Sequence, residues 1–276
     1  IDRTNGKFIS AKIFVDVNWA TGYDKNGRPI EVAAARQNEK PGDSIPGPFG
    51  AHNWHSMSYS AQTGLAYLPA QNIPVSLMDD KAWKFNENAP ARPHSALGWN
   101  TAMFINAAPP QSKPFGRLIA WDPVAQKQAW AVEHVSPWNG GTLATAGNLV
   151  FQGTADGRMM AYNAKTGEKL WETPTGTGVV AAPSTYMVDG KQYLSIAVGW
   201  GGVYGLAMRA TERQGPGTVY TFALGGKAPA PEFVQYRTDK LLQGVKYDPA
   251  KVPDGTLLYV SNCVFCHGVP GVDRGG

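Results

Sequence analysis

The stretch WNGGTLATAGNLVFQGTADGRMMAYNAKTGEKLW, Trp138 to Trp171, contains one complete copy of a pattern that recurs along the chain. Two short apolar runs within it, 148–153 and 158–162, are joined by Asp156-Gly157, a dipeptide that suits the φ > 0 positions of a tight hairpin turn. A second turn at 165–167 leads into a further run that ends at Trp171. The spacing predicts about four short strands in roughly 40 residues.

The end of this stretch, AYNAKTGEKLW (161–171), has a counterpart of equal length in AWDPVAQKQAW (120–130), whose start lies 41 positions earlier. Both segments begin with Ala, an aromatic residue and Asn or Asp, and both end in Trp. Four strands per repeat and a period near 40 residues are typical of the blades of a β-propeller. The alternative is a set of unrelated hairpins that share common turn residues.

Two weaker copies extend the pattern. One is SYSAQTGLAYL (58–68), and the other is IDRTNGKFIS (1–10), in which Asp2 and Gly6 fit and Ser10 replaces the tryptophan. We expect residues 73–115 to interrupt the repeat, because the copies at 58 and 120 start 62 positions apart.

Composition favours a turn-rich, all-β globular chain. The 276 residues include 32 Gly and 21 Pro, with 17% charged and 11% aromatic residues. The net charge of +4 is scattered, so we expect no nucleic-acid partner, and no apolar run is long enough to span a membrane. The chain does not begin with Met and ends shortly after Cys263-Val264-Phe265-Cys266-His267, so we expect it to be part of a longer protein.

Two pairs of residues between positions 50 and 80 are candidates for metal binding or for acid–base catalysis. His52 and His55 lie three apart, but in an extended segment they point to opposite faces, so a metal pair is not expected. Asp79 and Asp80 are adjacent acids, for which a solvated loop is the interpretation we favour.

Beyond Gly226 the pattern changes. We expect a Pro-rich linker over 227–250 and, over 251–276, the start of a new domain in which Asp254 caps a short helix.

That helix leads into Cys263-Val264-Phe265-Cys266-His267, the C-x-x-C-H pattern of c-type haem attachment. In such sites two thioethers, here from Cys263 and Cys266, hold the haem, and the histidine, here His267, is an axial ligand of the iron. The rival interpretations are a redox disulfide and half of a zinc site; no second Cys pair exists to complete the latter. No Met follows Met208, so the second axial ligand is not identified.

A propeller followed by cytochrome c resembles the pyrroloquinoline-quinone (PQQ) alcohol dehydrogenases of the quinohaemoprotein type. The resemblance rests on AYNAKTGEKLW, WNGGTLATAG, AHNWHS and VGWGGVYG together with C-x-x-C-H, and it covers essentially the whole chain. It implies that residues 1–226 are the C-terminal blades of an eight-bladed β-propeller, and that the remainder begins an all-α cytochrome c domain.

The resemblance also assigns a cofactor site. It implies that Trp138 lies under the flat quinone, that Asn53 and Trp54 lie at the quinone carbonyl edge, and that Gly199 and Trp200 form a rim contact. The tryptophans Trp130 and Trp171 stand at the repeat's closing position and are assigned to blade packing. The catalytic aspartate and the calcium ligands of the family are expected upstream of Ile1, so no catalytic residue is named here.

The implied function is oxidation of a primary alcohol by hydride transfer to PQQ, with electrons passed to haem c. We expect a periplasmic protein, a small alcohol as substrate, and a small cytochrome, a blue-copper protein or ubiquinone as electron acceptor. One alternative is a non-enzymatic propeller scaffold fused to an electron-relay cytochrome. Another is the large subunit of a membrane-bound alcohol dehydrogenase complex of the same family.

Overall fold

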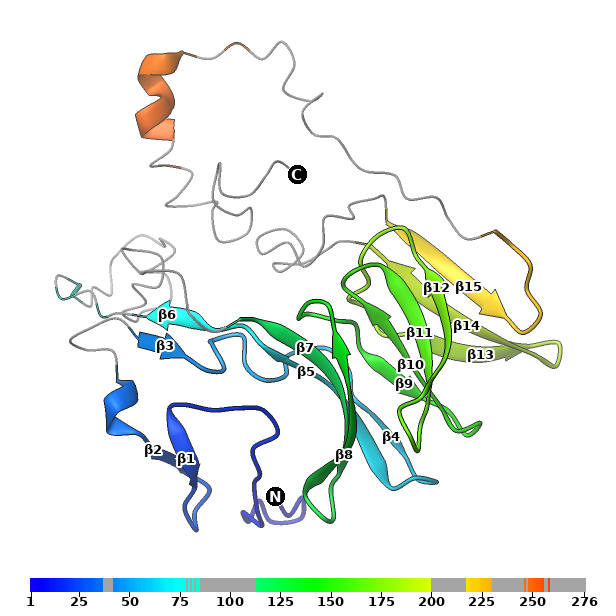
Figure 1. Cartoon of the computed structure of the whole chain (residues 1–276), viewed down its shortest axis with the longest axis horizontal. Coiled ribbons are helices and arrows are strands. Elements are labelled where there is room, and N and C mark those ends of the chain that lie inside the picture. The colour runs from blue at the N-terminus through cyan, green and yellow to red at the C-terminus, as the bar shows by residue number, and fades with distance from the viewer. Residues whose placement is uncertain are drawn as a thin grey trace.

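The computed structural model describes residues 1–36, 42–77, 79, 81, 83–84, 113–199, 217–229, 246, 248–255 and 258. Its main body consists of three antiparallel sheets (Figure 1). The first sheet has the order β4-β5-β7-β8 and the second β12-β11-β10-β9, and the third has the order β13-β14-β15.

The strands of the first sheet are β4 (Ser58–Ser60), β5 (Leu65–Asn72), β7 (Phe115–Asp122) and β8 (Lys127–His134). Those of the second are β9 (Thr142–Ala144), β10 (Leu149–Thr154), β11 (Arg158–Asn163) and β12 (Lys169–Pro174). Those of the third are β13 (Ser184–Val188), β14 (Lys191–Val198) and β15 (Thr218–Ala223).

The second sheet confirms the repeat predicted from its sequence. The hairpins turn where expected, with Gly157 at φ 86° and Gly167 at φ 75°, conformations that favour glycine. The last strand continues to Pro174 rather than ending at Trp171. The all-β class is confirmed for the described residues, whereas the number of blades, the domain boundaries and the cytochrome domain stay predictions.

The Asn or Asp of the closing hairpin shapes its turn by accepting backbone hydrogen bonds. Oδ1 of Asn163 accepts from Lys165 N at 2.9 Å, and Gly167 N donates to the Asn163 carbonyl at 2.9 Å. Asp2 repeats this arrangement, since its Oδ1 accepts from Thr4 N and its carbonyl accepts from Gly6 N, both at 2.8 Å. The copy at 1–10 is therefore confirmed at its turn.

The weaker copy at 58–68 forms a hairpin, but a different one from that expected. It contains β4 and β5, the first two strands of the sheet whose closing hairpin is 120–130. Strands β5 and β7 are hydrogen-bonded neighbours, so the insertion lies within one sheet and does not separate two. The expectation that 58 and 120 mark successive repeats is wrong. Turn residues in a sequence predict that a hairpin forms, but they do not show which strands of a sheet the hairpin provides.

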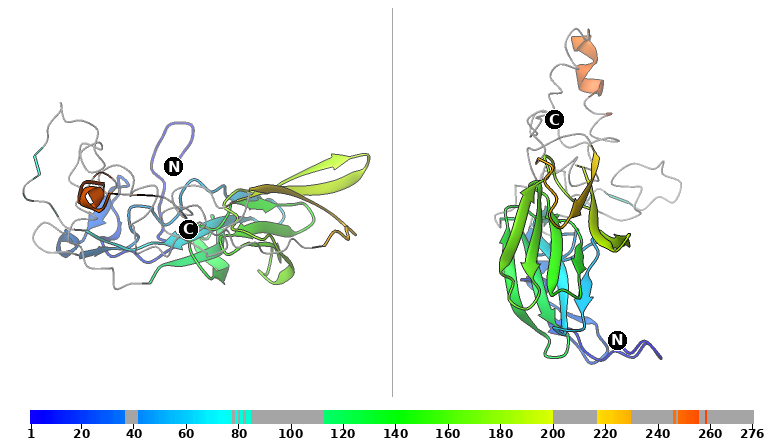
Figure 2. Two further views of the ribbon diagram at one scale, coloured as in Figure 1. Left: turned by 90° about the horizontal axis from the view of Figure 1, so that it is seen from above. Right: turned by 90° about the vertical axis from the view of Figure 1, so that its right-hand side faces the viewer.

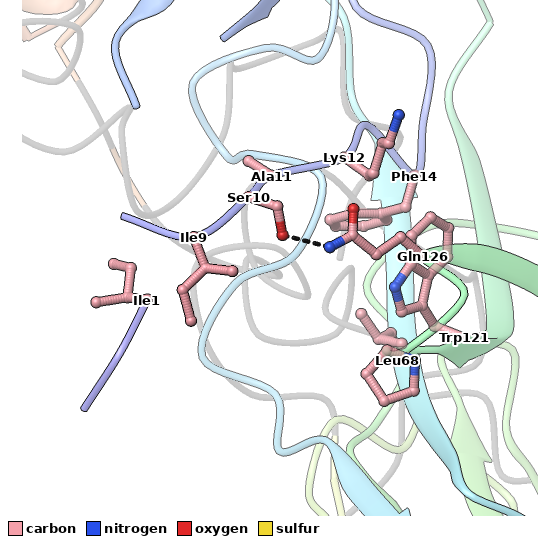
Figure 3. A pocket seen from close by; sticks show the side chains of 10 residues that line it. Ile1, Ile9, Ser10, Ala11, Lys12, Phe14, Leu68, Trp121 and Gln126 are labelled. Atoms are coloured by element: carbon pink, nitrogen blue, oxygen red, sulfur yellow. Dashed lines mark hydrogen bonds between the residues drawn. The ribbon is translucent and has the colours of Figure 1, made fainter. Parts of the chain in front are cut away.

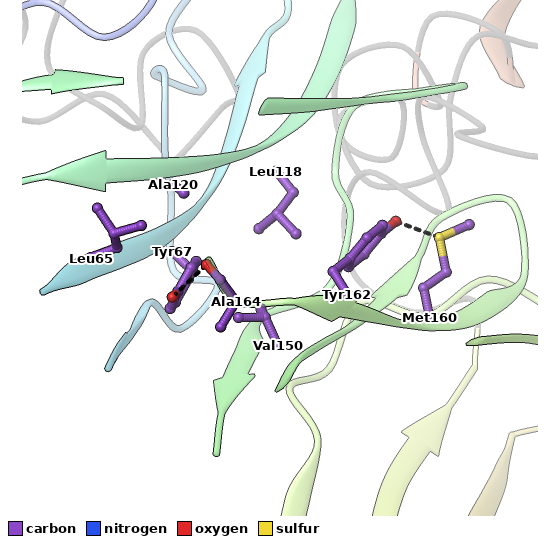
Figure 4. Packing of buried hydrophobic residues seen from close by; sticks show 8 residues of the cluster. All are labelled: Leu65, Tyr67, Leu118, Ala120, Val150, Met160, Tyr162 and Ala164. Carbon is purple, nitrogen blue, oxygen red and sulfur yellow. Dashed lines mark hydrogen bonds between the residues drawn. The ribbon is translucent and has the colours of Figure 1, made fainter. Parts of the chain in front are cut away.

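Alternating side chains bury both faces of the second sheet. Met160, Tyr162 and Val150 face the first sheet, in a cluster completed by Leu65, Tyr67, Leu118, Ala120 and Ala164 (Figure 4). Met159 faces the other way, toward Leu194, Ile196 and Val198 of the third sheet. This two-residue alternation is what a strand buried on both faces requires.

Trp130 joins the first sheet to the second. Its ring lies over Gly167, where an added Cβ would lie 2.7 Å from the indole, and its Nε1 donates to the Ala164 carbonyl at 3.2 Å. The same carbonyl accepts from the Tyr67 hydroxyl at 2.9 Å. Trp171, the equivalent residue of the next repeat, meets Phe222 of the third sheet edge to face at 5.3 Å. The assignment of both tryptophans to packing between sheets is confirmed.

Where the N-terminal segment meets the first sheet, a polar pair replaces the tryptophan–glycine contact seen between Trp130 and Gly167. Ser10 occupies the tryptophan position of its copy, and Gln126 occupies the glycine position of the next. Gln126 Nε2 donates to Ser10 Oγ across a groove of about 400 Å³ that Phe14 and Trp121 help to line (Figure 3). Ser10 is smaller than the tryptophan it replaces, and Gln126 is larger than the glycine it replaces, so the two changes occur together at this contact.

The remaining elements are short. They are β1 (Ala20–Tyr23), β2 (Pro29–Glu31), η1 (Ala33–Ala35), β3 (Gly42–Ser44), β6 (Val75–Leu77) and η4 (Pro249–Lys251). Figure 2 shows the β13–β14 hairpin projecting beyond the other two sheets, in agreement with the exposure of every residue of β13. Asp248 caps η4 through Ala250 N, and residues 252–255 are helical, so Asp254 lies inside the helix it was expected to cap.

We predict that Trp130→Ala in the full-length protein lowers the free energy of unfolding by about 3–5 kcal/mol, because it removes a large side chain from the contact between two sheets. Ser10→Ala, at the equivalent position of its copy, is expected to cost less than about 1 kcal/mol, because it removes one exposed hydrogen bond. Chemical denaturation followed by circular dichroism measures both. Equal losses for the two variants would show that the indole has no special part in joining the sheets.

Candidate functional site

Three segments that lead into the first strands of the sheets meet at one place. They are 45–57 before β4, 135–141 between β8 and β9, and 175–183 between β12 and β13, and we call them the linkers. Thr142, which follows the second linker, donates its backbone N–H to the Ser56 carbonyl of the first at 2.9 Å. Val180 of the third packs against Trp138 of the second.

Gly140 and Gly141 allow this close approach. A Cβ on Gly140 would lie 2.5 Å from the Ala181 carbonyl oxygen, and one on Gly141 would lie 2.5 Å from Ser56 Oγ and 2.9 Å from Ser56 N. Contacts this short with backbone atoms require movement of the linkers. The two glycines after Trp138-Asn139 are therefore needed for contact between the linkers.

Trp138 is buried at the centre of the linkers. It adopts φ 65° and is only 4% exposed, with Phe49 at 5.6 Å edge to face and Ile73 and Val180 in the same cluster. Its backbone N–H donates to Gln71 Oε1 at 3.1 Å. In this chain little of the indole surface is therefore open for a cofactor to cover.

Trp54 lies beside Trp138, and Asn53 is hydrogen-bonded to Phe49, which also packs on Trp138; their assignment to a quinone site stays a prediction. Asn53 Oδ1 accepts from Trp54 N at 2.8 Å, and its Nδ2 donates to the Phe49 carbonyl at 2.9 Å. The Trp54 indole is 61% exposed and meets Trp138 edge to face at 6.4 Å. Trp54 is thus the indole of this group whose surface is open.

His55 is a member of the group that sequence reasoning missed. The ring stacks on Trp54 at 4.7 Å and 20°, meets Trp138 edge to face at 4.9 Å, and is 3% exposed. Burial, assisted by the neighbouring His52, lowers the pKa of His55 to about 4, so the imidazole is neutral at pH 7. His52 instead places Nδ1 2.9 Å from the Pro69 carbonyl, so the two rings have different partners.

A second buried histidine connects two sheets to the same linker. His134 Nε2 lies 2.9 Å from Gln152 Oε1, and Gln152 Nε2 donates to the Gly140 carbonyl at 2.8 Å. Burial lowers the pKa of His134, and its hydrogen bond to Gln152 only partly offsets this. The orientation of the Gln152 amide therefore requires the proton of a neutral His134 to be on Nε2.

Gly199 approaches the site from β14. Its N–H donates to the Gly178 carbonyl of the third linker at 3.1 Å. The other predicted cofactor residues, Trp200, Cys263, Cys266 and His267, lie outside the described residues. Within the described part of the chain, no group of three or more His, Cys, Asp or Glu residues is placed to hold a metal ion, and no helix has the length and apolar character to cross a membrane.

Comparisons with known proteins agree on one family. The family model described as "PQQ: Glucose/ethanol/alcohol dehydrogenase, beta-propeller domain" matches residues 36–194. The chain is 77% identical to quinohemoprotein alcohol dehydrogenase of Comamonas testosteroni over 276 residues, and 64% identical to 1-butanol dehydrogenase (cytochrome c) of Thauera butanivorans. These matches cover 100% of this chain and 39% and 40% of those proteins, so the chain spans about two fifths of their length.

Solved structures show the same relationship. The crystal structure of the Comamonas testosteroni quinohemoprotein alcohol dehydrogenase matches with a TM-score of 0.83 at 76% identity, over 100% of this chain and 40% of that one. A europium-containing methanol dehydrogenase matches with a TM-score of 0.65 at 30% identity, over 76% of this chain and 36% of that one.

We predict that the full-length protein loses stability as the pH falls from about 6.5 to about 4. The pKa of His55 in the folded state is about 4 and its ordinary value is 6.5, so in that window the unfolded chain binds a proton that the folded chain does not. The loss from His55 is on the order of 3 kcal/mol, and His134 acts in the same direction. Thermal unfolding of the wild type and of His55→Phe across this pH window measures the loss of stability. If the variant loses as much stability as the wild type, the assignment to His55 is contradicted.

Proposed function

The chain belongs to the PQQ family of glucose/ethanol/alcohol dehydrogenase β-propeller domains, and we propose that it forms part of the quinone chamber of a quinohaemoprotein alcohol dehydrogenase. The observation that carries the proposal is the group formed by Asn53, Trp54, His55 and Trp138 in a chain 77% identical throughout to such an enzyme. All four residues lie in the region that the family model matches.

The residues present fit a planar quinone. Trp54 offers an open indole, and aromatic stacking contributes about 0.5–1.5 kcal/mol beyond the area it covers. The buried His55 Nε2 has no hydrogen-bond partner in the described structure, so a polar ligand atom could bind there. None of Asn53, Trp54 and Trp138 is charged, so the group supplies aromatic and hydrogen-bonding contacts rather than charge.

When bound, PQQ supplies the group that accepts the hydride from the alcohol. The contribution of this chain is to position that cofactor and to exclude water beside it. Trp138, which the resemblance places under the quinone, is buried here, so we propose that it supports Trp54 from behind while Trp54 presents the open surface. The proton acceptor and the calcium ligands are proposed to lie in other parts of the enzyme.

The C-x-x-C-H motif extends the proposal to electron transfer. Cys263 and Cys266 would hold haem c through thioethers and His267 would bind its iron, and the haem would supply a one-electron carrier to accept electrons from the quinone. The proposed acceptor beyond the haem is a small cytochrome or a blue-copper protein in the periplasm. A primary alcohol is the proposed substrate, in keeping with the 64% identity to 1-butanol dehydrogenase (cytochrome c) of Thauera butanivorans.

A second candidate is the dehydrogenase subunit of a membrane-bound complex that passes electrons to ubiquinone. Alcohol dehydrogenase (quinone), dehydrogenase subunit, of Acetobacter aceti is 37% identical over the whole chain. The 77% identity to the quinohemoprotein alcohol dehydrogenase favours the first candidate. Dependence of activity on detergent and co-purifying subunits would favour the second.

The direct test is alcohol oxidation by the purified full-length protein after addition of PQQ and calcium, followed with an artificial electron acceptor and by reduction of the haem spectrum. Activity that requires PQQ is expected. If no alcohol reduces either acceptor in the loaded protein, the enzymatic proposal is wrong and a scaffold with a relay cytochrome is favoured.

We predict that Trp54→Ala and Trp138→Ala separate quinone binding from folding. Trp54 is largely exposed, so its removal should lower quinone content per folded protein with little change in Tm. Trp138 is buried, so its removal should also lower the free energy of unfolding by about 3–5 kcal/mol. Quinone content and thermal unfolding measure the two effects. Unchanged quinone content in Trp54→Ala would show that the Trp54 indole does not contact the quinone.

We predict that Cys263→Ala combined with Cys266→Ala abolishes covalent haem and leaves dye-linked alcohol oxidation largely intact. The motif lies beyond the Pro-rich stretch that begins after Gly226, which we expect to separate two domains. Haem staining and dye-linked assays of protein made in a haem-loading periplasm measure both effects. Persistent haem stain would contradict the attachment assignment.

A further inference from the structure

His55 combines two features that a packing role alone does not require. The side chain is 3% exposed, and the ring makes close contacts with two indoles, of which Trp54 stacks on it and Trp138 meets it edge to face. At the same time its Nε2 is buried with no hydrogen-bond partner in the described structure.

Leaving such an atom unpaired is unfavourable. A buried polar group without a partner costs about 1–3 kcal/mol, and native structures contain few of them. A phenylalanine could make similar ring contacts without this cost. The position of the nitrogen therefore points to a partner that is not part of the described chain.

The surroundings of His55 define the chemistry of that partner. Among the described residues, the titratable group that acts on it electrostatically is His52, whose own ring bonds to the Pro69 carbonyl, and no described carboxylate contributes. A neutral imidazole carries a single N–H, and it can place this on Nε2 to donate to an acceptor oxygen. The Trp54 surface beside it suits a flat ring whose polar oxygens lie at the edge.

We propose that His55 is a further quinone-binding residue, whose Nε2–H donates a hydrogen bond to an edge oxygen of the quinone while Trp54 covers the adjoining ring. This rests on the proposed function, because it names an additional contact in the same chamber. His55 is a positioning residue that fixes the quinone in its plane, and it takes no part in proton transfer from the alcohol.

The experiment measures binding of PQQ to the full-length apoprotein by quenching of tryptophan fluorescence, together with the Tm of the apoprotein. His55→Phe keeps an aromatic ring and loses the nitrogen, so the Kd should rise about tenfold, the effect of one lost hydrogen bond. The Tm should stay the same or rise, because a buried unpaired polar atom has been removed. His55→Gln, whose amide N–H reaches a similar position to Nε2, should restore the Kd to within about threefold of the wild type.

His55→Asn is the matched control, because it has the same amide on a side chain one methylene shorter. It should bind PQQ as weakly as His55→Phe, and the Gln and Asn pair gives the result even where the Phe variant fails to fold. Equal Kd values for the wild type, Phe and Asn variants would overturn the proposal. An unchanged Kd with a lowered Tm would also overturn it, and would assign Nε2 to a structural water. A wild-type apoprotein that shows no saturable binding of PQQ would overturn the proposed function itself.

Discussion

The docking of Trp130 on the next sheet is the contact on which the rest of the structure depends. Its indole fits over Gly167 because that residue has no side chain, and the Ala164 carbonyl accepts hydrogen bonds from both Trp130 and Tyr67. The contact therefore fixes the sliding and the rotation of one sheet against the other, which apolar packing alone leaves freer. The same kind of residue recurs at Trp171, which carries the arrangement on to the third sheet.

This placement of the sheets determines the position of the linkers. Two of the linkers run from the outer strand of one sheet, β8 or β12, to the first strand of the next, and the linker 45–57 runs from β3 to β4. Sheets held side by side therefore bring their linkers together. Where the linkers meet, the backbone of residues 140–141 lies so close to Ser56 and Ala181 that a Cβ on either glycine would not fit. The His134–Gln152–Gly140 hydrogen bonds then join the last strand of one sheet to the linker that enters the next. The site is thus supported by the same interfaces that hold the sheets.

A structural feature could be predicted from the sequence when the interactions that cause it involve residues close together in the chain. The Asn163 turn, and its repeat at Asp2, were predictable because a side chain shapes its own backbone over a few residues. The place of the 58–68 hairpin was not, because the pairing of β5 with β7 across the insertion is set by long-range contacts. Proximity of Asn53, Trp54 and Trp138 came from resemblance to a family, whereas the burial of Trp138 and the exposure of Trp54 required the fold. His55 was considered only as a metal ligand, since nothing in its sequence context shows that its ring stacks on one indole and meets a second edge to face.

The group formed by Asn53, Trp54, His55 and Trp138 has a chemical character that bears on the proposed quinone chamber. Its residues are neutral, with aromatic surface from Trp54 and Trp138 and polar atoms from Asn53 and His55. The low pKa of His55 keeps even this imidazole uncharged at neutral pH. Such a group favours a flat ring in one orientation, but it cannot balance negative charge that forms on the ring when electrons arrive. In the proposed chamber, cations that balance this charge would be provided outside this group.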